Sequence, residues 1–269
     1  MPVNCINECN KLIRKLERNN YFSAAFPAYN SKLSEIIENL QLAGVAEAER
    51  VGNIKILSFL SEIMRTAQLL VEEFIQQRVN SGLISDASQA RKSAAGNIFQ
   101  QFVAYTMAKN VVLGNIEKEV IVTTSTKKIL DDYAVIKVGD DVQKPDSDVL
   151  IYSPSDTRSP IINFSCKTSC RERAGQTFKW KLLCDIATCN CEHKSTTASC
   201  PANRYHLEYH SQRQICMCFV TSDFYDEIGQ PQIAAMFNFF DRSYVAKPGV
   251  DEGSINSFEN VIDYINSLY

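Results

Sequence analysis

Two aspartates and a lysine mark the ends of two short apolar segments. DVLIY begins at Asp148, two residues after Asp146, and IINFSCK ends at Lys167. Short runs rich in valine, isoleucine and phenylalanine are typical of strands, and the polar SPSDTRSP between them predicts an antiparallel hairpin. In such a hairpin the start of the first strand lies beside the end of the second. We therefore expect the carboxylates and the lysine ammonium to meet at one end of a sheet.

Carboxylates beside a lysine have the chemistry for hydrolysing a phosphodiester bond. A carboxylate can hold Mg²⁺ next to a scissile phosphate, and an ammonium group can stabilise developing charge or orient the attacking water. The structural alternative is that Asp148 caps a turn and that Lys167 is a solvated strand end. The residues that follow Lys167 favour the catalytic interpretation.

A basic, acidic, basic triplet begins four residues after the lysine, at Arg171, Glu172 and Arg173. The planar fork of arginine can bind O6 and N7 of guanine, and a glutamate can accept a hydrogen bond from N4 of cytosine. The triplet therefore carries the groups needed to read G·C pairs in the major groove. The structural alternative is a helix N-terminus with a surface ion pair.

PDSDVLIY, FSCKTS and RER together resemble the PD-(D/E)xK nuclease superfamily. Within it they resemble type II restriction endonucleases that recognise CCGG or an interrupted CC/GG sequence, and most closely the BsaWI-type enzymes. The resemblance covers about residues 88 to 225. It implies a restriction-endonuclease-like fold, Mg²⁺-dependent cleavage of double-stranded DNA and base reading by Arg171, Glu172 and Arg173. It also implies a homodimer on a palindromic site and a cognate DNA methyltransferase that protects the same site.

The resemblance leaves the choice of metal-binding aspartate open. Asp146 follows Pro145, as the name of the superfamily suggests. Asp148 immediately precedes the apolar strand, which is the usual place for the catalytic aspartate. We favour Asp148 as the Mg²⁺ ligand, with Asp146 as the alternative.

The sequence departs from the superfamily at the position two residues before the lysine, where Ser165 replaces the usual acid. In ARKSAAGNIFQQF, which resembles the helix that often carries a metal-binding glutamate, Gln100 occupies the corresponding position, and its amide oxygen can bind Mg²⁺ weakly. Glu117 or Glu119 are alternatives, and the first acid downstream is Asp185. A DNA-binding protein with weak or absent catalysis on a nuclease fold is the second functional hypothesis.

A cysteine-rich segment offers another chemistry. Its thiol and imidazole groups are sufficient for tetrahedral zinc, and they belong to Cys184, Cys189, Cys191, His193 and Cys200. The spacing lacks the paired C-x2-C units of common zinc modules, so we favour packing roles for these cysteines. The alternative is a structural zinc, and with it a zinc-organised interaction protein in which the triplet is only a surface ion pair.

The elements that must position these residues follow from hydrophobic periodicity. Residues 11–17, 33–49, 56–79 and 90–112 place apolar residues three and four apart and predict helices, and SDAS at 85–88 offers several N-caps. Residues 119–124, 133–138, 148–152, 161–167 and 215–224 predict strands, with a further candidate at 237–246 and a final helix at 257–269. We therefore expect an α/β (α+β) fold in which a central mixed sheet is flanked by helices, with a helical N-terminal region at 1–87 and a nuclease domain at 88–269.

Composition is compatible with this assignment without requiring it. The 269 residues are 45% hydrophobic and 22% charged, with a net charge of −3, so any DNA contact must come from a local basic cluster. No stretch resembles a signal peptide or a membrane-spanning segment, so we expect a cytoplasmic protein without a membrane partner, whose ten cysteines are mostly thiols.

Overall fold

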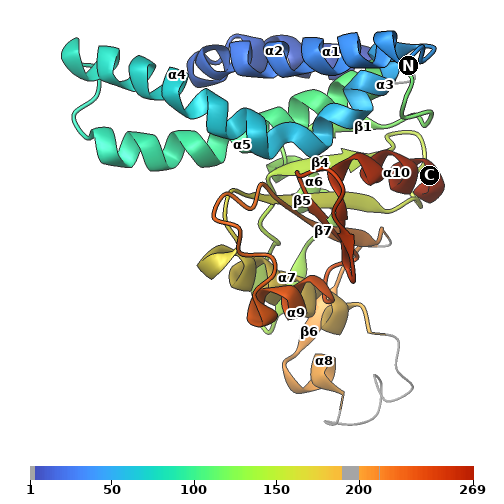
Figure 1. The fold of residues 1–269 in the computed structure, drawn as a ribbon. Helices are drawn as coiled ribbons and strands as arrows, with labels where there is room; N and C mark the ends of the chain where they lie inside the picture. The colour runs from blue at the N-terminus through green and yellow to red at the C-terminus, as the bar shows by residue number, and fades with distance from the viewer. Residues whose placement is uncertain (1–3, 190–199, 212) are drawn as a thin grey trace.

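The computed structural model describes residues 4–189, 200–211 and 213–269, and for residues 171–174, 176, 232 and 252 it describes the backbone only. A layer of long helices covers one face of a mixed sheet, and shorter helices lie against the other face (Figure 1). The helical layer consists of α1 (Cys5–Glu17), α2 (Asn20–Leu42), α3 (Ala48–Lys55), η1 (Ile56–Phe59), α4 (Leu60–Asn80) and α5 (Ala87–Val112). This confirms the predicted fold class.

Local sequence signals set the ends of these helices. The side chain of Asp86 accepts a hydrogen bond from the Gln89 amide (3.0 Å) and caps α5, which confirms an N-cap within SDAS. The helical pattern of residues 33–49 is broken between α2 and α3, where Gly44 adopts a φ of 71°. A left-handed residue ends a helix at little strain when it is glycine, and the apolar periodicity alone does not reveal such a break.

The main sheet has seven strands in the order β1-β4-β5-β7-β8-β10-β9. They are β1 (Ile121–Thr123), β4 (Val149–Tyr152), β5 (Ile161–Lys167), β7 (Ile215–Thr221), β8 (Arg242–Val245), β9 (Asp251–Glu252) and β10 (Ile255–Ser257). The predicted hairpin is confirmed, because β4 and β5 are antiparallel and Val149 is opposite Phe164. β5 and β7 are parallel and pair Lys167 with Thr221, so their carboxyl ends meet at one end of the sheet.

The remaining elements lie around the main sheet in Figure 1. They are α6 (Lys127–Tyr133), α7 (Arg171–Ala187), α8 (Pro201–Arg204), α9 (Pro231–Phe237), η3 (Phe258–Asn260) and α10 (Val261–Leu268), with a second sheet of β2 (Ile136–Val138), β3 (Asp141–Gln143) and β6 (Leu207–Tyr209). The strand candidate at 237–246 is shorter than expected, because its first residue ends α9 and β8 begins only at Arg242. Pro231, at the first position of α9, favours that helix.

One continuous core joins the helical layer to the sheet. Phe99 and Phe102 of α5 are fully buried in the same cluster as Val149 and Phe164 of the hairpin. The opposite face of the sheet packs on α7, where Trp180 contacts a separate cluster. The helical layer is therefore built into the fold, and the domain division at residues 87 and 88 stays a prediction.

The free ends of α4 and α5 form an antiparallel arm, residues 70–97, that projects beyond the sheet (Figure 1). None of the helices in the described ranges is long and apolar enough to cross a membrane.

Candidate active site

Lys167 ends β5 and meets two aspartates at the start of β4. Its side chain is nearly buried, with the residue 9% exposed. Nζ lies 2.8 Å from Oδ2 of Asp148 and 3.8 Å from Oδ2 of Asp146. The antiparallel register brings these groups together, because Asp148 directly precedes Val149, and Val149 pairs with Phe164 near the end of β5. The structure thus places the three residues as the hairpin predicted, and their catalytic roles stay predictions.

Asp148 is held on several sides. Its Oδ2 also accepts a hydrogen bond from the Cys166 amide at 2.7 Å, and its own amide donates to the Phe164 carbonyl at 3.1 Å. Oδ1 of Asp148 makes no hydrogen bond among the described residues, so this oxygen remains for a cation or a water. Asp146 is looser, since its side chain is 53% exposed against 19% for Asp148. The geometry therefore favours Asp148 as the pre-positioned carboxylate and leaves Asp146 as a more exposed second one.

Gln100 reaches the same site from α5. Its Nε2 donates to the backbone carbonyl of Asp148 at 2.7 Å. The amide of Gln100 therefore lies against the backbone of Asp148. The position that the sequence suggested for an upstream metal ligand is therefore adjacent to the site, although an amide binds Mg²⁺ less strongly than a carboxylate.

The three alternative acids lie elsewhere. Glu119 accepts a hydrogen bond from Ser155, in the connection at the opposite end of the hairpin, and Glu117 lies two residues before it in the chain. Asp185, in the last turns of α7, is paired with Lys181 at 2.5 Å. The structure does not bring these acids to Asp148.

Ser165 occupies the position where the superfamily usually has an acid. It is 1% exposed, and its hydroxyl lies 2.9 Å from that of Thr177 on α7. A buried hydroxyl pair thus replaces a carboxylate between β5 and α7. Within the described residues no three histidine, cysteine or acidic side chains form a group that could hold a metal ion. The oxygen donors of the site are the two aspartates and the Gln100 amide.

The triplet of Arg171, Glu172 and Arg173 forms the first turn of α7. The helix begins at Arg171, directly after its N-cap, Cys170. Only the backbone of Arg171, Glu172 and Arg173 is described, and it begins four residues beyond Lys167 at the same end of the sheet. The chain therefore places the proposed base-reading residues next to the proposed chemistry, and their base contacts stay a prediction.

A family model described as BsaWI restriction endonuclease type 2 matches residues 123–267, more than half of the chain. The chain belongs to the BsaWI restriction endonuclease family. Members of this family are type II restriction endonucleases, which are site-specific deoxyribonucleases, so the substrate is DNA. No curated protein matches the chain.

The matched range begins in β1 and ends in α10. It contains the Asp148 and Lys167 site and the triplet of this BsaWI family member. The resemblance had suggested an earlier range, 88–225. Gln100 and the arm lie outside the matched range, so the family match gives no information on the upstream side of the site.

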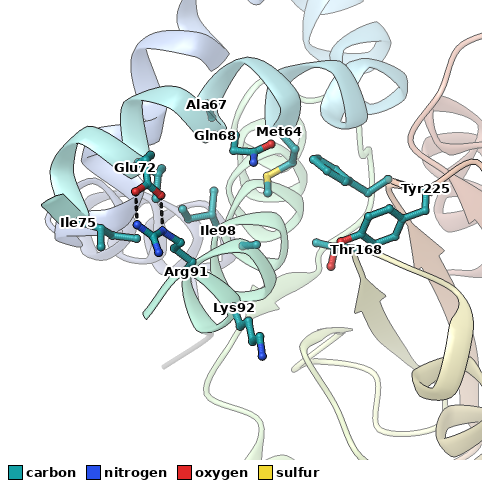
Figure 2. A pocket seen from close by; sticks show the side chains of 13 residues that line it. Met64, Ala67, Gln68, Glu72, Ile75, Arg91, Lys92, Ile98, Thr168 and Tyr225 are labelled. Atoms are coloured by element: carbon teal, nitrogen blue, oxygen red, sulfur yellow. Dashed lines mark hydrogen bonds and ion pairs between the residues drawn. The ribbon is translucent and has the colours of Figure 1, made fainter. Parts of the chain in front are cut away.

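A cleft of about 250 Å³ lies beside the site, between the arm and the chain after β7 (Figure 2). Its lining is mainly apolar and includes Met64, Ala67, Val71, Ile98, Phe224 and Tyr225. Thr168, the residue after Lys167, is at one side, and a bidentate pair between Arg91 and Glu72 is at the other (2.6 and 2.5 Å). Lys92 is exposed and points away from that pair (Figure 2). In the described part of the chain Lys92 has no ion pair, so its charge is available to a phosphate.

The cysteine segment is only partly described. Cys184 and Cys200 are buried in one apolar cluster with Leu207, and Cys189 is half-buried. Burial raises the pKa of the Cys184 thiol to about 12, so without a metal it is a neutral packing group. Cys191 and His193 lie outside the described residues. The zinc alternative stays untested.

Proposed function

We propose that this endonuclease hydrolyses both strands of double-stranded DNA at a palindromic site that contains CCGG, or CC and GG separated by a short spacer, and that it requires Mg²⁺. The observation that carries the proposal is the meeting of Lys167 with Asp148 at 2.8 Å, four residues before the triplet at the start of α7. The residues proposed for phosphate chemistry and for base reading therefore lie close together in the chain, at the end of β5 and the start of α7.

The donor set of the site fits Mg²⁺. Asp148, Asp146 and Gln100 offer oxygen atoms only, and Mg²⁺ in nucleases is usually held by one or two carboxylates together with substrate phosphate. Two aspartates are therefore sufficient, even with Ser165 at the position of the usual acid. When bound, Mg²⁺ neutralises charge on the scissile phosphate and makes a bound water more acidic.

Lys167 can donate a hydrogen bond to a phosphate at this site. Its ammonium group has three N–H donors, and Asp148 accepts one of them at 2.8 Å while Asp146 lies at 3.8 Å. A remaining donor is available to a non-bridging phosphate oxygen or to the attacking water. Gln100 and the Cys166 amide hold Asp148 in place, so the carboxylate needs little rearrangement when the substrate binds.

Sequence reading is assigned to Arg171, Glu172 and Arg173. The arginines donate to guanine and the glutamate accepts from cytosine. A two-fold dimer presents the triplet once to each half of a palindrome and one active site to each strand. In the cell such an enzyme needs a cognate methyltransferase that modifies the same site, and we place both in the cytoplasm.

A sequence-specific DNA-binding protein with little or no catalysis is the second candidate. The hydroxyl pair of Ser165 and Thr177 favours it, because no carboxylate replaces the usual acid there. Digestion of plasmid DNA with Mg²⁺, followed by sequencing of the ends, separates the two functions. We expect breaks at one palindromic sequence with C·G pairs. Binding of such a duplex without any cleavage would instead establish the second function.

A further inference from the structure

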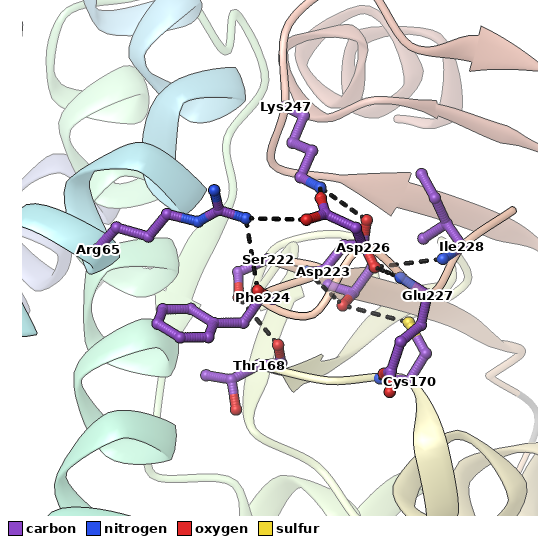
Figure 3. A network of polar contacts seen from close by, with 11 residues as sticks. Arg65, Thr168, Cys170, Ser222, Asp223, Phe224, Asp226, Glu227, Ile228 and Lys247 are labelled. Carbon is purple, nitrogen blue, oxygen red and sulfur yellow. Dashed lines mark hydrogen bonds and ion pairs between the residues drawn. The ribbon is translucent and has the colours of Figure 1, made fainter.

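The chain that follows β7 makes hydrogen bonds to the segment between Lys167 and the triplet. We call residues 222–228 the clamp loop. Because β5 and β7 are parallel neighbours, the clamp loop leaves the sheet beside residues 167–170 (Figure 3). The Ser222 amide donates to the Lys167 carbonyl at 3.1 Å, and the Phe224 amide donates to the Thr168 carbonyl at 3.0 Å.

The third contact reaches the start of α7. Oε2 of Glu227 accepts a hydrogen bond from the Cys170 amide at 3.0 Å. Glu227 is 1% exposed and Cys170 is fully buried, so this bond is shielded from water. The side chain of Cys170 makes no capping hydrogen bond, although it stands at the N-cap of α7.

This contact replaces a local capping arrangement. In a capping box the third helical residue is a glutamate or glutamine, whose side chain accepts from the N-cap amide. In α7 that position is Arg173, the last residue of the triplet, so the first turn offers no such group there. A carboxylate from a distant part of the chain supplies the acceptor, and negative charge near a helix N-terminus is favourable.

The clamp loop is itself fixed by charge. Asp223, 1% exposed and at a φ of 47°, accepts from the Glu227 amide at 2.6 Å and from the Ile228 amide at 3.2 Å. Its other oxygen accepts from Lys247 at 2.7 Å. Burial lowers the pKa of Lys247, but hydrogen bonds to Asp223 and Asp226 outweigh that effect and raise the pKa above its ordinary value. The ammonium therefore stays charged and holds Asp223 in place.

We propose that Glu227 is a positioning residue for sequence recognition. By holding the backbone at the N-terminus of α7, it fixes the triplet relative to Lys167. The inference rests on the proposed function, since it assumes that the triplet reads bases. Lys167 has its own partners in Asp148 and the β5 ladder, so we expect Glu227 to affect discrimination among sequences more than phosphate chemistry.

The test compares Glu227→Ala, Glu227→Gln and Asp226→Ala with the wild-type protein. Glutamine keeps an acceptor oxygen for Cys170. Asp226 lies on the same loop with its side chain 71% exposed, and it pairs with Lys247 and Arg65 rather than with α7. Asp226→Ala therefore removes the same charge without touching the helix. For each variant the ratio of affinities for a CCGG duplex and for singly substituted duplexes is measured with Ca²⁺ at fixed salt.

We expect Glu227→Ala to lower this ratio about tenfold, the effect of losing one well-oriented base contact, while Glu227→Gln and Asp226→Ala stay near the wild-type ratio. An unchanged ratio for Glu227→Ala, an equal loss in Asp226→Ala, or a full loss in Glu227→Gln would overturn the proposal. A uniform loss of affinity for all duplexes, as general unfolding produces, would overturn it as well.

Two further measurements distinguish this inference from the proposed function. The wild-type ratio alone tests whether C·G pairs are read. Amide hydrogen exchange tests the contact without DNA, because Glu227→Ala should speed exchange in residues 170–175 while β5 stays protected. Unchanged exchange in these residues would refute the cap even if the protein proves to be a CCGG-specific nuclease.

Discussion

Replacing Asp148 by alanine or by asparagine should separate its structural role from its chemical one. Oδ2 accepts from the Cys166 amide at 2.7 Å and from Lys167 at 2.8 Å. Alanine leaves a buried amide without its acceptor, which costs about 1–3 kcal/mol, and weakens a charged hydrogen bond of similar size. Lys167 can turn toward Asp146 and water, so we expect a total loss of about 2–4 kcal/mol in the free energy of unfolding. For a chain of this length that corresponds to a fall in Tm of roughly 4–7 °C.

Asparagine is the matched variant because it has nearly the same shape and keeps an oxygen for the Cys166 amide. We expect it to lose only about 1 kcal/mol of stability. Both variants remove the carboxylate that would hold Mg²⁺, an interaction of several kcal/mol in the transition state. Since each 1.36 kcal/mol is a factor of ten in rate, both should cleave at least about 10³-fold more slowly.

The assays are thermal unfolding and single-turnover cleavage of plasmid DNA with Mg²⁺. Near wild-type cleavage by Asp148→Asn would refute the assignment of Asp148 as metal ligand. A loss of cleavage confined to Asp146→Ala would move that role to Asp146, whose exposed side chain predicts little effect on stability. Unchanged Tm in Asp148→Ala would show that the strand ends are held without this carboxylate.

Four further predictions concern metal binding and DNA contacts. Gln100→Glu should retain or increase Mg²⁺-dependent cleavage, because a carboxylate binds this cation better than an amide, and complete loss of cleavage would contradict a ligand role. Lys92→Ala should weaken binding to all duplexes alike and reduce by about one the slope of the logarithm of affinity against the logarithm of salt concentration. Lys118→Ala, beyond the far end of α5, is the control and should leave both the affinity and this slope unchanged. Equal slopes for the two variants would refute a phosphate contact by Lys92. Arg171→Ala and Arg173→Ala should each lose about 1–3 kcal/mol of discrimination per base contact, measured as the affinity for CCGG relative to substituted duplexes. An unchanged preference in both variants would instead support the alternative that the triplet only forms a surface ion pair. A strong chelator should abolish cleavage and leave Tm unchanged if the cysteines only pack, while a fall in Tm would support a structural zinc.

The features that followed from sequence are those set by short-range patterns. The two short apolar runs and the polar turn between them predicted the antiparallel hairpin, and therefore the meeting of Asp148 with Lys167. The polar run before α5 predicted an N-cap among residues 85–88, and the structure places it at Asp86. The backbone of α7 begins at Arg171, so the helix N-terminus that the structural alternative assumed is present, while base reading by the triplet stays a prediction.

The remaining features depend on contacts between distant parts of the chain. Glu227 caps α7 from 57 residues away, which requires the parallel pairing of β5 with β7. The cluster of acids in SDFYDE, directly after a buried strand, was the available signal for it. The pairing of Ser165 with Thr177 was equally hidden, since two hydroxyl residues on a strand and a helix have no pattern that marks them as neighbours. The second sheet joins β2 to β6 across some seventy residues of intervening chain, and strand propensity gives no information on such partners.

The central question is whether the Asp148 and Lys167 site cleaves DNA at a defined sequence. The decisive measurement is digestion of plasmid DNA by the wild-type protein and by Lys167→Ala with Mg²⁺, with sequencing of every new end and a thermal unfolding control. We predict ends at a single palindrome that contains CCGG, or CC and GG around a short spacer, and no cleavage by the folded variant. Cleavage by folded Lys167→Ala at the wild-type rate, or wild-type ends without any common sequence, would contradict this prediction.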